Sequence, residues 1–95
     1  MDETDTFLFI IRTIPMIKCL RDLFEKCPRD TISFIISAVS DFQNFLKIAK
    51  FHQMSAELEK LKTLLNAHPN KMSLTLGLMT LDKMHSYMVT KLNES

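Results

Sequence analysis

The chain has 95 residues, of which 46% are hydrophobic, with a single Gly, no Trp and a formal net charge of +1. A chain of this length makes one domain, and folding hides only roughly 60% of the surface that so short an unfolded chain exposes. One glycine is too few for the many tight turns of an all-β domain, so we expect an all-α fold. Lys and Arg are scattered along the chain, which argues against nucleic acid as the main partner.

The first residues are acidic, whereas a secretory signal begins with basic residues, so we expect an intracellular protein, cytoplasmic or nuclear, that is not secreted. Arg12 and Pro15 interrupt the apolar run from Phe7 well short of the ~20 residues that cross a bilayer, which predicts no membrane span. Cys19 and Cys27 lie about 12 Å apart along a continuous helix, too far for a disulfide bond. We expect both to be reduced thiols in the core.

The first predicted helix carries apolar residues at spacings of three and four from Phe7 to Cys27. Pro15 lies inside it, and an interior proline costs ~3 kcal/mol unless the helix kinks or restarts, so we expect a kink at Ile11 to Ile14. Other apolar residues lie off the main stripe. The N-terminal half of this helix is therefore apolar on more than one side, and we expect another surface to cover it.

Residues 30–68 form the longest periodic stretch, and Asp30 can cap its first turn. One apolar stripe covers residues 32–49, and a second, with the a/d spacing of a coiled coil, covers residues 51–65. The centres of the two stripes differ by about a third of the helix circumference. The stretch is either one helix that changes its apolar face or two helices separated within residues 50–55. Because no Pro or Gly lies there, we favour a continuous helix.

After the break at residues 68–70, Asn70 or Ser73 can cap a last helix with an apolar stripe over residues 74–92. Gly77 lies inside it, either to permit a close helix crossing or because it is tolerated. The predicted fold is all-α: a small antiparallel bundle of three long helices, with a break in the central one as the alternative, in a single domain over residues 1–95. We expect residues 1–5 and 93–95 to fray, and oligomerisation to complete the bundle.

No motif in the chain indicates a reaction. The three histidines, His52, His68 and His85, stand in no metal-binding spacing, and one Gly cannot form a phosphate-binding loop. The two cysteines belong to an apolar helix, which favours a structural role over that of a nucleophile. We expect no catalytic, cofactor or metal site and no small-molecule substrate. The sequence therefore favours a protein that is not an enzyme.

Two short patterns have both a structural and a functional interpretation. Leu61 to Leu65 match the LxxLL form of helices that dock into coactivator grooves, but the same leucines fit the a/d seam, and we favour packing in the core. Four of the seven methionines, Met72, Met79, Met84 and Met88, lie in the last helix. Flexible thioethers suit an adaptable binding surface, although an ordinary core is the preferred interpretation.

Three helices in so short a chain leave a surplus of apolar surface, and exposed patches beyond a few hundred Å² usually mark protein contacts. We therefore expect a non-enzymatic interaction or assembly subunit that packs its helices against a second copy, in a homodimer, or against a partner's helices. The predicted interface residues mostly lie off the principal stripes: Phe9, Ile11, Met16, Phe45, Ile48, Phe51, Leu76, Met79 and Tyr87.

Two other hypotheses fit the same length. A signalling adaptor of the death-fold kind has six short helices and would require breaks near Pro15, near residues 50–55 and near Gly77. It would also associate through charges and be sensitive to salt, whereas an apolar interface would not. A membrane-surface protein could use Phe7 to Leu20 as an interfacial helix, but anionic lipid would repel the acidic residues that precede it.

Overall fold

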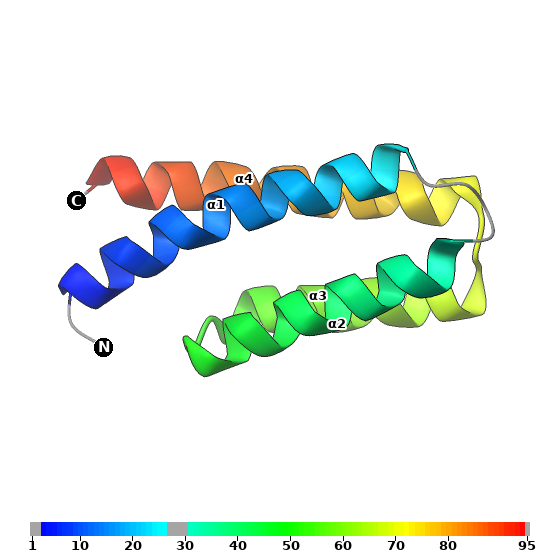
Figure 1. Ribbon diagram of the computed structural model, residues 1–95, viewed down its shortest axis with the longest axis horizontal. Coiled ribbons are helices and arrows are strands. Elements are labelled where there is room, and N and C mark those ends of the chain that lie inside the picture. The colour runs from blue at the N-terminus through cyan, green and yellow to red at the C-terminus, as the bar shows by residue number, and fades with distance from the viewer. Residues whose placement is uncertain (1–2, 27–30, 95) are drawn as a thin grey trace.

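The computed structural model describes residues 3–26 and 31–94, and these residues form four helices joined by short connections, with no strand among them. The helices are α1 (Glu3–Glu25), α2 (Ile32–Ile48), α3 (His52–Ala67) and α4 (Lys71–Glu94). Successive helices run antiparallel, and α1 lies beside α4 while α2 lies beside α3 (Figure 1). The all-α prediction is confirmed, but the predicted number of three helices is wrong because the central stretch is two helices.

The break in the central stretch is a turn at Ala49 to Phe51. Lys50 has a φ of 65°, in the left-handed region, and its N–H donates to Lys47 O at 3.0 Å. The N–H of Phe51 donates to Leu46 O, also at 3.0 Å. These two bonds are the Schellman motif that commonly ends a helix at a glycine. A lysine in this conformation costs about 1–2 kcal/mol. Because a lysine occupies the position where glycine is usual, the sequence carries no glycine signal for the turn.

The two apolar stripes of the central stretch explain why the chain turns back. Within α2 the predicted stripe is buried, from Ile32 to Leu46, and Ala49 is buried beside it. Within α3 the second stripe is buried from Met54 to Leu65. Because the stripes point in different directions on one continuous helix, only a reversal lets both face the same core. The predicted N-cap Asp30 lies outside the described residues, and Thr31 at the start of α2 makes no side-chain capping bond.

Helix α1 is continuous through Pro15, which is exposed. Nearby, the hydroxyl of Thr13 is fully buried and donates to Phe9 O at 2.7 Å. The C-terminal half of α1 runs alongside α4, while the N-terminal half diverges from α4 toward the turn between α2 and α3 (Figure 1). That divergence brings Phe9 onto the rings of Phe45 and Phe51, with centroids 4.4 and 5.2 Å away.

All four helices contribute to one core. Its buried residues are Ile10, Ile17, Leu20 and Phe24 of α1, Ile35, Val39, Phe42 and Leu46 of α2, Met54, Leu58, Leu61 and Leu65 of α3, and Leu81, Met84 and Met88 of α4. Along each helix the buried positions follow the spacing of three or four residues that the sequence predicts for its apolar stripe. The single chain thus encloses its own four-helix core.

Gly77 lies at a close contact between α4 and the side chain of Phe24 on α1. A Cβ atom at this position would overlap the ring of Phe24, lying 2.7 Å from its Cδ2, and would lie 3.2 Å from Leu61 Cδ1. The ring of Phe24 therefore occupies the space that any other residue at position 77 would need. Of the two interpretations of Gly77, the close helix crossing is the one that the structure supports.

Helix α4 is capped at its start. The side chain of Asn70 accepts a hydrogen bond from the N–H of Ser73 at 2.9 Å, the bond that an N-cap asparagine makes with the third residue of a helix. Asn70 is thus the cap, and Ser73 lies inside the helix and is buried. An ion pair links α4 to α1, with Arg21 Nε 2.8 Å from Asp82 Oδ1, but both side chains are partly exposed and such pairs contribute little.

Candidate functional site

The outer face of α4 carries a stripe of exposed apolar side chains. Its residues recur at three and four along the helix, so they lie on one side of it. The exposed fractions are 74% for Met72, 42% for Leu76, 55% for Met79 and 46% for Tyr87, and Lys83 lies among them and is also exposed. We call these five residues the α4 outer face. The core side of the same helix carries Ser73, Gly77, Leu81, Met84 and Met88.

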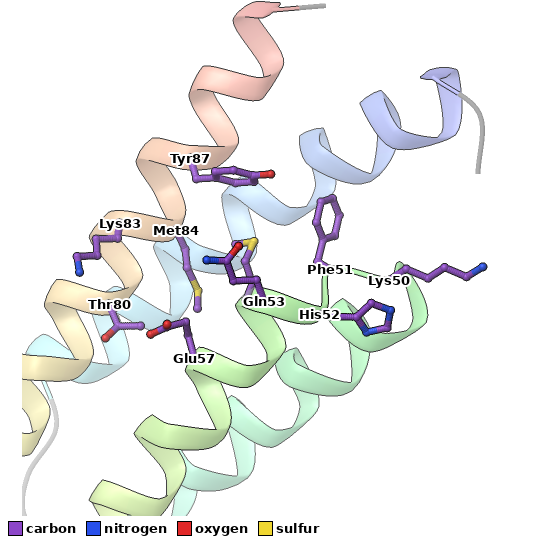
Figure 2. Close-up of a pocket in the computed structure, with 10 residues that line it drawn as sticks. Lys50, Phe51, His52, Gln53, Glu57, Thr80, Lys83, Met84 and Tyr87 are labelled. Carbon is purple, nitrogen blue, oxygen red and sulfur yellow. The ribbon is translucent and has the colours of Figure 1, made fainter.

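A groove of about 600 Å³ adjoins this face at the end of the molecule where α2 turns into α3 (Figure 2). Phe51 and Met54 line it from the turn and α3, and Met84 and Tyr87 line it from α4. Its polar lining residues are Lys50, His52, Gln53, Glu57, Thr80 and Lys83. Tyr87 and Lys83 belong both to the groove and to the α4 outer face, so the two form one continuous surface.

Two charged groups of this surface, Glu57 and Lys83, lack partners among the described residues. Glu57 of α3 and Thr80 of α4 face each other across the groove (Figure 2). Within the part of the chain that the structure describes, neither Glu57 nor Lys83 makes an ion pair or a side-chain hydrogen bond. Both are therefore available to a partner. Farther along α4, Lys91 Nζ lies 5.7 Å from the centroid of the Tyr87 ring, a weak cation–π contact.

The nine predicted interface residues fall into two groups. Four of them are packed within the chain: Met16 lies partly buried against the core, and Phe9, Phe45 and Phe51 form the stacked aromatic cluster between α1 and the α2–α3 turn. The other five are exposed: Ile11, Ile48, Leu76, Met79 and Tyr87. The fold brings Leu76, Met79 and Tyr87 together on the α4 outer face, whereas Ile11 lies on α1 and Ile48 at the end of α2.

Sequence reasoning did not include Met72, Lys83 or Glu57 in the predicted interface. Met72 and Lys83 share the three-and-four spacing of Leu76 and Met79, and that spacing could have identified them. Glu57 could not have been found in this way because it reaches the surface from a different helix. Further exposed apolar residues, Phe7, Leu8, Leu23 and Phe34, lie on α1 and α2.

The two ambiguous sequence patterns are resolved by burial. In the LxxLL segment, Leu61 and Leu65 are buried in the core, so these leucines are already used within the fold. The methionines of α4 divide between the two interpretations, since Met84 and Met88 are in the core while Met72 and Met79 are exposed.

Cysteine and histidine side chains are placed as follows. Cys19 is exposed and free, so the expectation of a core thiol is wrong at this position: it lies on the outward side of α1. Cys27 lies outside the described residues. His52 and His68 are exposed, while His85 is partly buried and its Nε2 has no hydrogen-bond partner among the described residues. No group of three or more His, Cys, Asp or Glu side chains suited to a metal ion occurs in residues 3–26 and 31–94.

One polar network lies away from this surface, between α2 and α3. Gln43 is 3% exposed, and its amide nitrogen donates to Glu59 Oε2 at 2.7 Å and to Ser55 O at 3.2 Å. Its amide oxygen accepts from Lys62 Nζ at 3.1 Å. The hydrogen bond from Gln43 and the charge of Lys62 lower the pKa of Glu59 below its usual value of 4.5. The network fixes α2 against α3 and involves no residue of the groove.

No family model matches the chain, and comparisons with curated proteins and with solved structures found no match. Among the described residues, no helix is both long enough and apolar enough to cross a membrane. The site must therefore be interpreted from its own residues.

Proposed function

We propose that the chain is a non-enzymatic interaction or assembly subunit that acts by packing the α4 outer face against a helix of a second copy or of another protein. The observation that carries this proposal is the pattern of α4 itself, which is apolar on its core side and again along its outer face. A helix that needs only to close a four-helix core has a polar outward side. A second apolar stripe at helical spacing indicates a second helical neighbour.

The composition of the stripe supports an interface over a chance accumulation. Single exposed hydrophobic residues are normal, but Met72, Leu76 and Met79 follow one another without a charge between them on that face. Methionine and tyrosine are enriched in interface cores, and thioethers adapt to irregular surfaces. The exposed residues Phe34 and Ile48, by comparison, lie on opposite ends of α2.

The alternative of a six-helix signalling adaptor finds less support. Among its three required breaks, only the one within residues 50–55 has a counterpart, at Ala49 to Phe51, because α1 continues through Pro15 and α4 continues through Gly77. The surface that is available for association is also mainly apolar, whereas that alternative relies on charges.

Site-specific photo-crosslinking in cells tests the proposal whichever protein the partner is. A photoreactive residue at Met79 should give one or a few discrete adducts, with the same chain or with another protein. The matched control carries the same residue at Asn44, an exposed polar position on α2. Adducts that are no more discrete or abundant at position 79 than at position 44 would overturn the proposal.

A further inference from the structure

We propose that the partner of the α4 outer face is a second copy of this chain, packed antiparallel with a two-fold axis at the level of Leu81. This inference rests on the proposed function and adds the identity and the register of the partner. It follows from the spacing of the face, from the one charge within it and from the position of Glu57.

The spacing of the face suits a helix pair. Met72, Leu76, Met79 and Lys83 alternate steps of four and three, which is the seam of two helices packed side by side. Thr75 and Ser86, at the margin of the seam, are small enough to let a second helix approach closely. A seam that is apolar except for one lysine selects among registers, because the lysine must reach a partner of opposite charge or water.

The position of Lys83 selects the antiparallel orientation. A parallel pair in register would place the two Lys83 side chains against each other and would align the helix dipoles unfavourably. An antiparallel pair centred on Leu81 places Lys83 level with the partner's Met79, since the two positions are equally far from the axis. It also places Leu76 level with the partner's Ser86, where the small side chain leaves room for the leucine.

The same register makes the charges complementary. Thr80 follows Met79 in the sequence and faces Glu57 across the groove (Figure 2). A Lys83 side chain that lies level with the partner's Met79 therefore reaches the mouth of the partner's groove, beside the partner's Glu57. The two-fold axis repeats the pair, so that two lysines and two glutamates that lack ion pairs among the described residues of the single chain gain them together.

The size of the contact predicts its strength. One helix pair buries less than the ~800 Å² per partner of a standard stable interface, so we expect a dimer that exchanges with a folded monomer. The sequence predicts oligomerisation to complete the bundle, whereas the four helices of one chain already enclose the core.

Charge reversal tests the register. The variants Lys83→Glu, Glu57→Lys and the double variant are compared with the wild type by sedimentation or light scattering over a hundredfold range of concentration. The wild type should dimerise with increasing concentration, each single variant should raise the Kd at least tenfold, and the double variant should restore most of the loss. Arg12→Glu is the matched control because Arg12 is an exposed cation on α1, and it should leave the Kd unchanged.

Two results would overturn this inference. One is a wild type that stays monomeric at every concentration, and the other is a double variant that associates no better than the single variants. Neither outcome removes the proposed function, since crosslinks from position 79 to a different protein would then identify a hetero-partner. An absence of discrete crosslinks would remove both.

Discussion

At the scale of single residues, a buried polar side chain can join two helices when its hydrogen-bonding groups have partners. Gln43 is the clearest case, because a buried amide without partners would cost about 1–3 kcal/mol, and here its nitrogen and its oxygen are both bonded. Its hydrogen bond to Glu59 stabilises the charged carboxylate. Since that carboxylate is exposed, the effect on the pKa is easier to measure than any effect on stability.

The first prediction concerns the pKa of Glu59 and its pH dependence. The pKa is lowered in the folded state, so the Gln43–Glu59 contact contributes stability above the unfolded value of about 4.5, and that contribution disappears as the pH falls through the lower folded pKa. The variant Gln43→Leu should raise the pKa of Glu59 toward 4.5 and flatten the pH dependence of unfolding in that acidic range. NMR titration of the Glu59 carboxyl measures the shift directly.

The control for this prediction is Asn44→Leu, which changes an exposed amide next to Gln43 on α2. It should leave the pKa of Glu59 where it is in the wild type. If Gln43→Leu has no more effect than Asn44→Leu, then the lysines near Glu59 lower its pKa and the hydrogen bond from Gln43 does not.

At the scale of elements, the packing of α1 on α4 depends on a large residue that meets the smallest one. Phe24 is 2% exposed, and its ring lies over the backbone of α4 at Gly77. Glycine inside a helix costs about 1 kcal/mol relative to alanine, so helix propensity by itself favours replacement. The close approach of Phe24 predicts the opposite sign for the whole protein.

The second prediction is that Gly77→Ala lowers the free energy of unfolding by about 1–3 kcal/mol, because the new methyl group displaces a packed ring. In the Phe24→Leu background, the same substitution should cost much less or even stabilise the protein, since a leucine can move aside. Urea denaturation of the four proteins in this double-mutant cycle measures the coupling. Equal costs in both backgrounds would mean that the contact with Leu61, and not the ring of Phe24, decides the effect.

At the scale of the whole molecule, the four helices form a closed core and leave apolar side chains exposed on the outer face of α4. Because buried residues are distributed over all four helices, we expect the chain to fold without a second copy. Association would then add a neighbour to a completed fold. This separation of folding from association can be measured.

The third prediction is that Lys83→Glu keeps the helical content of the wild type and unfolds cooperatively at a temperature that does not depend on protein concentration. The wild type, in contrast, should have a Tm that rises with concentration, because a partner that binds only the folded chain stabilises it by mass action. Thermal unfolding followed by circular dichroism over a hundredfold range of concentration distinguishes the two. Loss of helix in the variant at low concentration would show instead that the fold requires the dimer.

How much of this molecule could be predicted depends on whether a feature is local. The apolar stripes identified every core-facing side of the four helices, because burial of a helix follows directly from residue spacing. Asn70 is among the expected caps for a similar reason, since a cap bonds within four residues. The sequence also identified Leu76, Met79 and Tyr87 as candidates for an interface, because they lie outside the main stripe of their own helix.

Long-range features were decided only by the tertiary structure. The turn at Lys50 could not be predicted because no Gly or Pro marks it, and only the need of both central stripes to face one core stabilises a lysine in the left-handed region. The same folding back packs Phe9, Phe45 and Phe51 against the core, although the sequence assigns them to an interface. It also brings Glu57 next to the α4 outer face. The sequence by itself determined which side of each helix is apolar. The tertiary structure decided which apolar residues cover one another and which remain exposed, because this depends on contacts between helices that are distant in the chain.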